Sequence, residues 1–138
     1  MNQTAIFFPV IALVALTFLV GSLTLVRRIG AANAGKVGPK DFRYGESDRV
    51  PPETVLPGRN YMNLLELPVL FYVVCICLYV TKTATLIDVG LAWAFTLSRV
   101  GHSIVHLTTN NVIHRMLVFN LGSVILIALW IRFAVSLL

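Results

Sequence analysis

Charged residues are scarce in this chain of 138 residues. Only 12% of the residues are Asp, Glu, Lys or Arg, whereas a soluble domain has about 25%. Just six residues are acidic. Apolar residues make up 57% against the usual ~45–50%. Too few polar side chains remain to cover a soluble surface. The composition therefore argues against a soluble globular domain, a disordered chain and a coiled coil, and it favours an integral membrane protein.

Cysteine is scarce too, which argues against a disulfide framework. The two thiols, Cys75 and Cys77, lie two residues apart in one apolar run. On a helix they would point about 200° apart, so we expect two buried, unpaired thiols.

Basic residues outnumber acidic ones and give a net charge of +5. An excess of this kind can indicate nucleic-acid binding. Here, however, the basic residues lie mostly at the ends of apolar runs. Membrane topology and anionic lipid explain that placement better than nucleic acid does.

Apolar runs long enough to cross a bilayer occur four times. About 20 apolar residues are needed for one span, and the runs cover residues 5–26, 61–80, 86–107 and 116–138. The first lacks the basic start and cleavage site of a signal peptide, so we expect it to be retained. The predicted fold is a single all-α transmembrane domain over residues 1–138, a four-helix bundle. Short turns make the last three helices antiparallel neighbours, and an asparagine near residues 108–111 can cap the fourth helix.

The one long polar stretch, residues 29–58, contains five of the nine glycines and four of the six prolines. This composition predicts an irregular loop. Nine basic residues lie on the side of this loop and two on the other, which predicts a cytosolic loop with both termini outside. Small size and the lack of targeting signals favour a multi-pass protein of a bacterial plasma membrane.

Ionisable residues inside these spans are costly, so each is a candidate functional residue. In the second span, Arg59, Asn63 and Glu66 fall within about 60° of one another on a helix. They could form a structural Arg–Glu pair or a ligand-binding stripe, to which Asn63 adds an amide. Pro68 can kink the helix there.

A second polar face lies on the third span, where Arg99, His102 and His106 share one side of the helix. Arg115 opens the fourth span, with His114 beside it as an interfacial residue. His102 and His106 could bind haem or a metal, but Arg99 and Arg115 would repel a cation, so we predict no metal site. We expect the polar groups of three helices to converge on one layer near the cytosol.

Such a layer suits a polyanionic, partly amphoteric ligand. Arginines grip carboxylates through paired hydrogen bonds, a glutamate can pair with an ammonium group, and an arginine near a thiol favours the nucleophilic thiolate. Glutathione, with two carboxylates, one amine and one thiol, meets these requirements, as would other ligands that carry the same groups.

These residues resemble the MAPEG superfamily, the membrane-associated proteins of eicosanoid and glutathione metabolism. The resemblance covers nearly the whole chain, and it is carried by the motif Arg59-x-x-x-Asn63-x-x-Glu66 followed by Pro68. The resemblance is closest to the prostaglandin E synthase branch. It is supported there by the pair Arg99-x-x-His102 and by Arg115, which lies nine residues after His106.

The resemblance implies a homotrimer that binds glutathione between subunits near the cytosolic face, while a lipophilic substrate enters from the bilayer. By position, Asn63 and Glu66 would hold glutathione, and His102 would line the same site. Arg115 would stabilise the thiolate, as the catalytic residue. Arg59 and Arg99 would contact the ligand or brace Glu66. Arg27 or Arg28 could reach a neighbouring subunit's ligand.

Departures from the prostaglandin synthase pattern leave two functions open. His106 stands where that branch has a tyrosine, and further polar positions are occupied by Met62, Met116 and Phe119. The resemblance thus predicts a membrane-bound glutathione-dependent transferase or peroxidase. The alternative is a non-catalytic protein of the same fold that binds a lipid or a partner.

Overall fold

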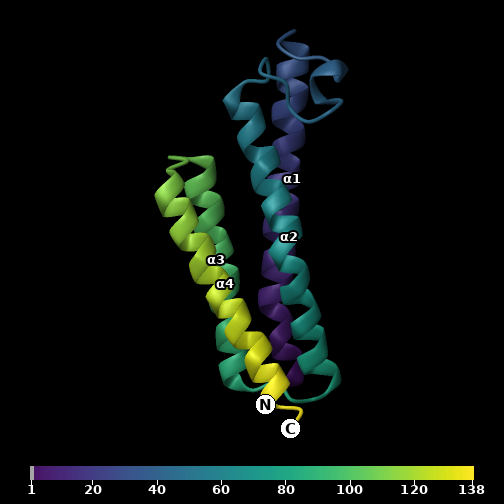
Figure 1. The fold of residues 1–138 in the computed structure, drawn as a ribbon. Helices are drawn as coiled ribbons and strands as arrows, with labels where there is room; N and C mark the ends of the chain where they lie inside the picture. The colour runs from purple at the N-terminus through teal and green to yellow at the C-terminus, as the bar shows by residue number, and fades with distance from the viewer. Residues whose placement is uncertain (1) are drawn as a thin grey trace.

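The computed structural model describes residues 2–138, and within them every regular element is helical (Figure 1). Four long helices follow one another: α1 (Phe7–Asn33), α2 (Pro52–Val80), α3 (Leu86–Leu107) and α4 (Val112–Val135). Two short 3-10 turns, η1 (Gln3–Ile6) and η2 (Pro39–Phe42), precede α1 and follow it. The predicted all-helical fold is confirmed.

Three of the helical stretches are long and apolar enough to cross a membrane, namely Gln3–Asn33, Pro52–Val80 and Val112–Val135. The sequence predicted four spans, and α3 is the exception. Its length is adequate, but Asp88, Arg99, His102 and His106 lower its hydropathy. All four of these side chains are buried in the bundle, so the polar surface of α3 faces protein.

The loop between the first two helices is shorter than predicted. We expected it over residues 29–58, yet α1 continues to Asn33 and α2 already begins at Pro52. Gly35, with a φ of 67°, lies just beyond the end of α1. Pro52 occupies the first helical position, where a missing N–H costs nothing. Pro51 and Pro52 therefore mark the start of a helix, whereas the composition alone assigned both residues to the loop.

Side chains at the helix starts explain where α3 and α4 begin. Thr85 caps α3 in a reciprocal arrangement with Asp88, and Asn111 caps α4 by accepting hydrogen bonds from the N–H groups of Ile113 and His114. The predicted asparagine cap is confirmed. Such caps satisfy amide groups that no helical carbonyl reaches.

The helices pack as two pairs, α1 with α2 and α3 with α4. The pairs meet at the end that carries both termini and diverge toward the end that carries the loop (Figure 1). At the closed end, Phe71 stacks on Phe95 with ring centroids 4.7 Å apart, and Arg132 Nε donates to Asp88 Oδ1 at 2.6 Å. Cys75 and Cys77 are both free thiols, and only Cys75 is fully buried.

Candidate functional site

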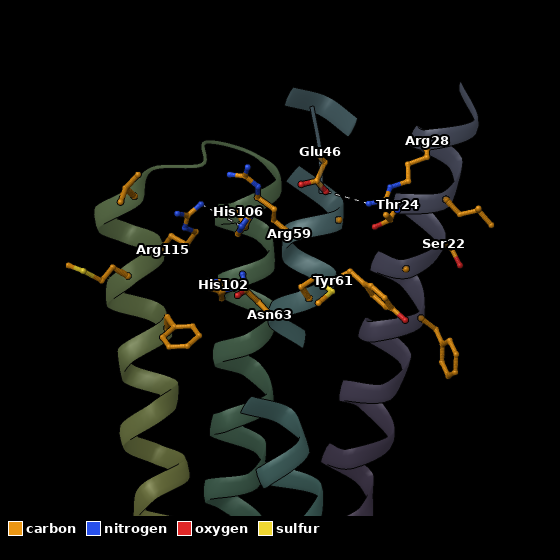
Figure 2. A pocket seen from close by; sticks show the side chains of 18 residues that line it. Ser22, Thr24, Arg28, Glu46, Arg59, Tyr61, Asn63, His102, His106 and Arg115 are labelled. Atoms are coloured by element: carbon orange, nitrogen blue, oxygen red, sulfur yellow. Dashed lines mark hydrogen bonds and ion pairs between the residues drawn. The ribbon is translucent and has the colours of Figure 1, made fainter. Parts of the chain in front are cut away.

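A cleft of about 1130 Å³ opens where the helix pairs diverge (Figure 2). All four helices line it, and one residue of the loop, Glu46, reaches it as well. Its polar lining includes Arg28, Glu46, Arg59, Asn63, His102, His106 and Arg115. Its apolar lining includes Phe18, Leu25, Met62, Val112, Met116 and Phe119. The cleft therefore combines a positively charged set of side chains with an apolar wall.

Close packing of α1 on α2 builds one side of the cleft. A Cβ added at Gly58 would come within 3.3 Å of Arg28 Nη2, and one at Gly21 would come within 3.0 Å of the Tyr61 ring. Glycine at these two positions leaves room for the larger side chains. Arg28 Nη2 lies 3.4 Å from Glu46 Oε1, and the guanidinium lies 4.8 Å from the centroid of the Phe42 ring.

Arg115 and His106 form the other side of the cleft (Figure 2). Arg115 Nη1 lies 2.7 Å from Asn110 Oδ1 and 3.5 Å from His106 Nε2. A guanidinium can only donate, so Nε2 is the acceptor and the proton of a neutral His106 sits on Nδ1. That Nδ1 atom is buried and has no hydrogen-bond partner among residues 2–138.

Most of the predicted site residues lie together in the cleft. These are Arg28, Arg59, Asn63, His102, His106 and Arg115. Of the two arginines left open at the end of the first helix, Arg28 lines the cleft, whereas Arg27 lines a separate, smaller groove.

Glu66 does not line the cleft of its own chain. The helical period groups it correctly with Arg59 and Asn63, but the opposite face of α2, with Asn60, Leu64 and Pro68, is the buried one. Glu66 is exposed and makes no ion pair with Arg59 in the described part of the chain. The hypothesis of an Arg–Glu structural pair is therefore wrong for a single chain.

Arg99 does not line the cleft either, although it lies beneath it. Its side chain is buried between the Phe95 and Phe119 rings, 5.4 Å and 4.9 Å from their centroids. Its Nη2 atom donates to the backbone carbonyls of Val118 and Phe119 at 3.3 Å and 3.1 Å. The expectation that Arg99 braces Glu66 is wrong, because backbone oxygens of α4 hold the guanidinium instead.

Two residues of this region, Glu46 and Asn110, were not predicted from the sequence to belong to the site. Glu46 was hidden because nothing in a loop sequence shows which residue folds back over a distant helix. Asn110 was considered only as a possible cap, yet its side chain contacts Arg115. Within residues 2–138, no group of three or more His, Cys, Asp or Glu side chains is placed to hold a metal ion.

Comparison with known proteins gives one match. The family model described as the MAPEG family matches residues 6–135. No curated protein and no solved structure matches the chain. The match covers nearly the whole chain, and the structure has three helices able to span a membrane. The chain therefore belongs to the MAPEG family.

Proposed function

We propose that this protein is a membrane-bound, glutathione-dependent transferase or peroxidase that acts on a lipophilic electrophile. The observation that carries the proposal is the cleft itself, where Arg28, Arg59 and Arg115 converge on one space and a single carboxylate, Glu46, shares it. MAPEG proteins include glutathione-dependent transferases and peroxidases, and also members without catalytic activity.

Glutathione suits the charges of the cleft as a co-substrate. Its two carboxylates and its thiolate are three anionic groups for three arginines, which bind such groups through charge-assisted hydrogen bonds. Its ammonium group can pair with Glu46, and Asn63 offers an amide to the peptide backbone. The Arg28 side chain is 42% exposed, so its guanidinium can also donate to an anion.

Arg115 would stabilise the thiolate, because a nearby positive charge favours the ionised thiol. In a transfer reaction, the thiol proton passes to solvent, a sulfur–carbon bond forms, and the leaving group departs with the electron pair. In a peroxidase reaction, the thiolate sulfur attacks a peroxide oxygen and the O–O bond breaks. The attacked oxygen stays on sulfur as a sulfenic acid, and the departing alkoxide takes up a proton to become the alcohol. The thiol of a second glutathione then attacks the sulfenic sulfur, which forms the disulfide and releases the hydroxyl as water. His102, Met116 and Phe119 would border the reacting groups.

The outward position of Glu66 supports a homotrimer with sites between subunits. This carboxylate is exposed beside Met62, Leu65 and Val69 on α2. A carboxylate that faces lipid within the bilayer is costly, by about 2.5–3.5 kcal/mol at the centre and less toward the surface. A second copy packed on this face would cover Glu66 and bring it to the neighbour's ligand. In such a trimer, Glu66 and an arginine at the end of α1 would contact glutathione at the interface between two subunits.

The remaining topological features are also part of the proposal. In it α3 crosses the membrane beside α4, the loop and the cleft face the cytosol, and both termini lie outside, in a bacterial plasma membrane. The spacing of Arg59, Asn63, Arg99, His102 and Arg115 supports a place near the prostaglandin E synthase branch.

Thiolate absorbance tests the proposal. Adding glutathione to the purified protein is expected to produce the ultraviolet band of a bound thiolate at neutral pH. Arg115→Ala should abolish this band, whereas Arg115→Lys should restore part of it, because lysine keeps the charge but loses the planar fork. A wild-type protein that shows no thiolate at millimolar glutathione would contradict the proposal.

A non-catalytic role in lipid or partner binding is the second candidate. The observation that favours it is the apolar share of the cleft, where Met62, Met116 and Phe119 occupy positions that are polar in the prostaglandin synthase pattern. This role predicts a co-purifying lipid and no turnover with model electrophiles. Activity that Glu66→Ala abolishes while the trimer stays intact would count against it.

A further inference from the structure

Asn110 lies in the turn between α3 and α4, at the edge of the cleft. Its backbone has a φ of 46°, in the left-handed region, and its N–H donates to the carbonyl of Val105 at 2.8 Å. Its side-chain Oδ1 accepts a hydrogen bond from Arg115 Nη1 at 2.7 Å. This is the shorter of the two contacts that hold the Arg115 guanidinium, since His106 Nε2 lies 3.5 Å away.

The backbone of this turn does not require the amide of Asn110. Glycine adopts a positive φ without strain, and aspartate tolerates it nearly as well as asparagine does. Asn111, the next residue, already caps α4. Two adjacent asparagines therefore have separate tasks: Asn111 starts the helix, and the side chain of Asn110 reaches back to Arg115.

A neutral acceptor holds Arg115 without cancelling its charge. In the described part of the chain, Arg115 has no carboxylate partner, and its Nε and Nη2 groups make no hydrogen bond. Arginine has a long side chain with many rotamers, so a fixed orientation lowers the entropy lost when an anion binds. Asn110 can supply that orientation and leave the remaining N–H groups free.

We propose that Asn110 is a positioning residue that aims the Arg115 guanidinium into the cleft for an anionic group of the ligand. The identity of that group as a thiolate rests on the proposed function. The contact between Asn110 and Arg115 is independent of that function, because it is made within the chain itself.

Two substitutions separate this role from a purely structural one. Asn110→Gly keeps the turn and removes the acceptor, whereas Asn110→Asp keeps an acceptor but adds a carboxylate that pairs with Arg115. A residue that serves only the turn predicts that both variants behave as wild type. Thr109→Gly is the matched control, because it adds a glycine to the same turn at an exposed residue.

Thiolate absorbance, titrated with glutathione across pH, gives the first readout. Asn110→Gly is expected to bind up to about tenfold more weakly, because the freed guanidinium must be immobilised when the anion binds, and to raise the pKa of the bound thiol. Asn110→Asp should bind more weakly still, because its carboxylate competes for the guanidinium. Thr109→Gly should match wild type.

Modification of Arg115 by a dicarbonyl reagent, followed by mass spectrometry, gives a readout that needs no glutathione. Release of the guanidinium in Asn110→Gly should speed modification several-fold, and pairing in Asn110→Asp should slow it. If wild type forms no thiolate but these rates change as expected, the proposed function fails and the positioning role stands. Wild-type modification rates in both variants would overturn the positioning role, whatever glutathione does.

Discussion

Replacing Gly122 by alanine should destabilise the bundle through Arg99. Gly122 lies on α4, opposite the buried guanidinium, and a Cβ built there would overlap Arg99 Nη2 and crowd Ser98 Oγ. The guanidinium cannot simply withdraw, because its Nη2 atom donates to two carbonyls of α4 and the ring faces of Phe95 and Phe119 flank it.

One stabilising and two destabilising effects set the size of the change in unfolding free energy. Alanine gains about 1 kcal/mol over glycine inside a helix. Overpacking a well-filled interior costs about 1–3 kcal/mol, and losing one hydrogen bond to a charged group costs about 1.5–3 kcal/mol. We therefore expect a net loss of about 1.5–5 kcal/mol in the free energy of unfolding. For a chain of this size, that loss lowers the melting temperature by about 5–15 °C.

Thermal unfolding in detergent measures the effect, with Gly90→Ala as the matched control. Gly90 lies in α3 and has nothing within 4 Å of its Cβ position, so alanine there should leave the stability unchanged or raise it slightly. Shortening the guanidinium partner, in Arg99→Met combined with Gly122→Ala, should recover part of the loss if the two residues collide. Equal melting temperatures for the two alanine variants would refute the packing argument.

Three further predictions concern the two ends of the bundle. Asp88→Asn should lower stability by about 1–2 kcal/mol in thermal unfolding, because a neutral amide oxygen replaces the carboxylate that accepts the 2.6 Å hydrogen bond of Arg132, and because the cap of α3 weakens. In the loop, the hydrogen bond from Ser47, aided by a backbone N–H, holds the pKa of Asp41 below its ordinary value of 3.8. A lowered pKa in the folded state means that this stabilisation is full above the ordinary value and is lost as pH falls through the folded one. Proteolysis of the loop should therefore speed up in acid for wild type, whereas Asp41→Asn is cleaved faster at neutral pH and changes less with acid. Glu46→Gln should weaken glutathione binding about tenfold through loss of the ammonium partner, but should strengthen binding of a simple dianion, which calorimetry can compare.

The sequence predicted local features well wherever a short-range signal determines them. The limits of α3 agree with the expected residues 86–107, because Thr85 and Asp88 form a capping box at its start and polar turn residues follow its end. The loop limits were wrong, because a proline is as compatible with the first turn of a helix, where Pro52 lies, as it is with a loop.

The site was predicted in part, and the errors arise because local patterns do not determine tertiary contacts. Helical periodicity fixes the angle between residues on one helix, so Arg59, Asn63 and Glu66 do share a face. It does not fix which way that face points. Glu66 faces outward because Asn60 and Leu64 on the opposite face fill the interior. Arg99 was expected to contact the ligand or to brace Glu66, but backbone carbonyls of α4 accept its hydrogen bonds, and the sequence gives no sign of them.

The two ends of the bundle differ in how their polar and charged groups are paired, and this contrast supports the proposed site. At the closed end, Arg132 is paired with Asp88 at 2.6 Å, and Gln3 exchanges two hydrogen bonds with the backbone of Ala84, so donors and acceptors match. At the open end, three arginines share one carboxylate, and Arg28 Nε and His106 Nδ1 are buried without partners within residues 2–138. Unmatched donors are costly where water is scarce. An anion in the cleft would balance the excess of positive charge there, which supports the proposal that the ligand binds at this end.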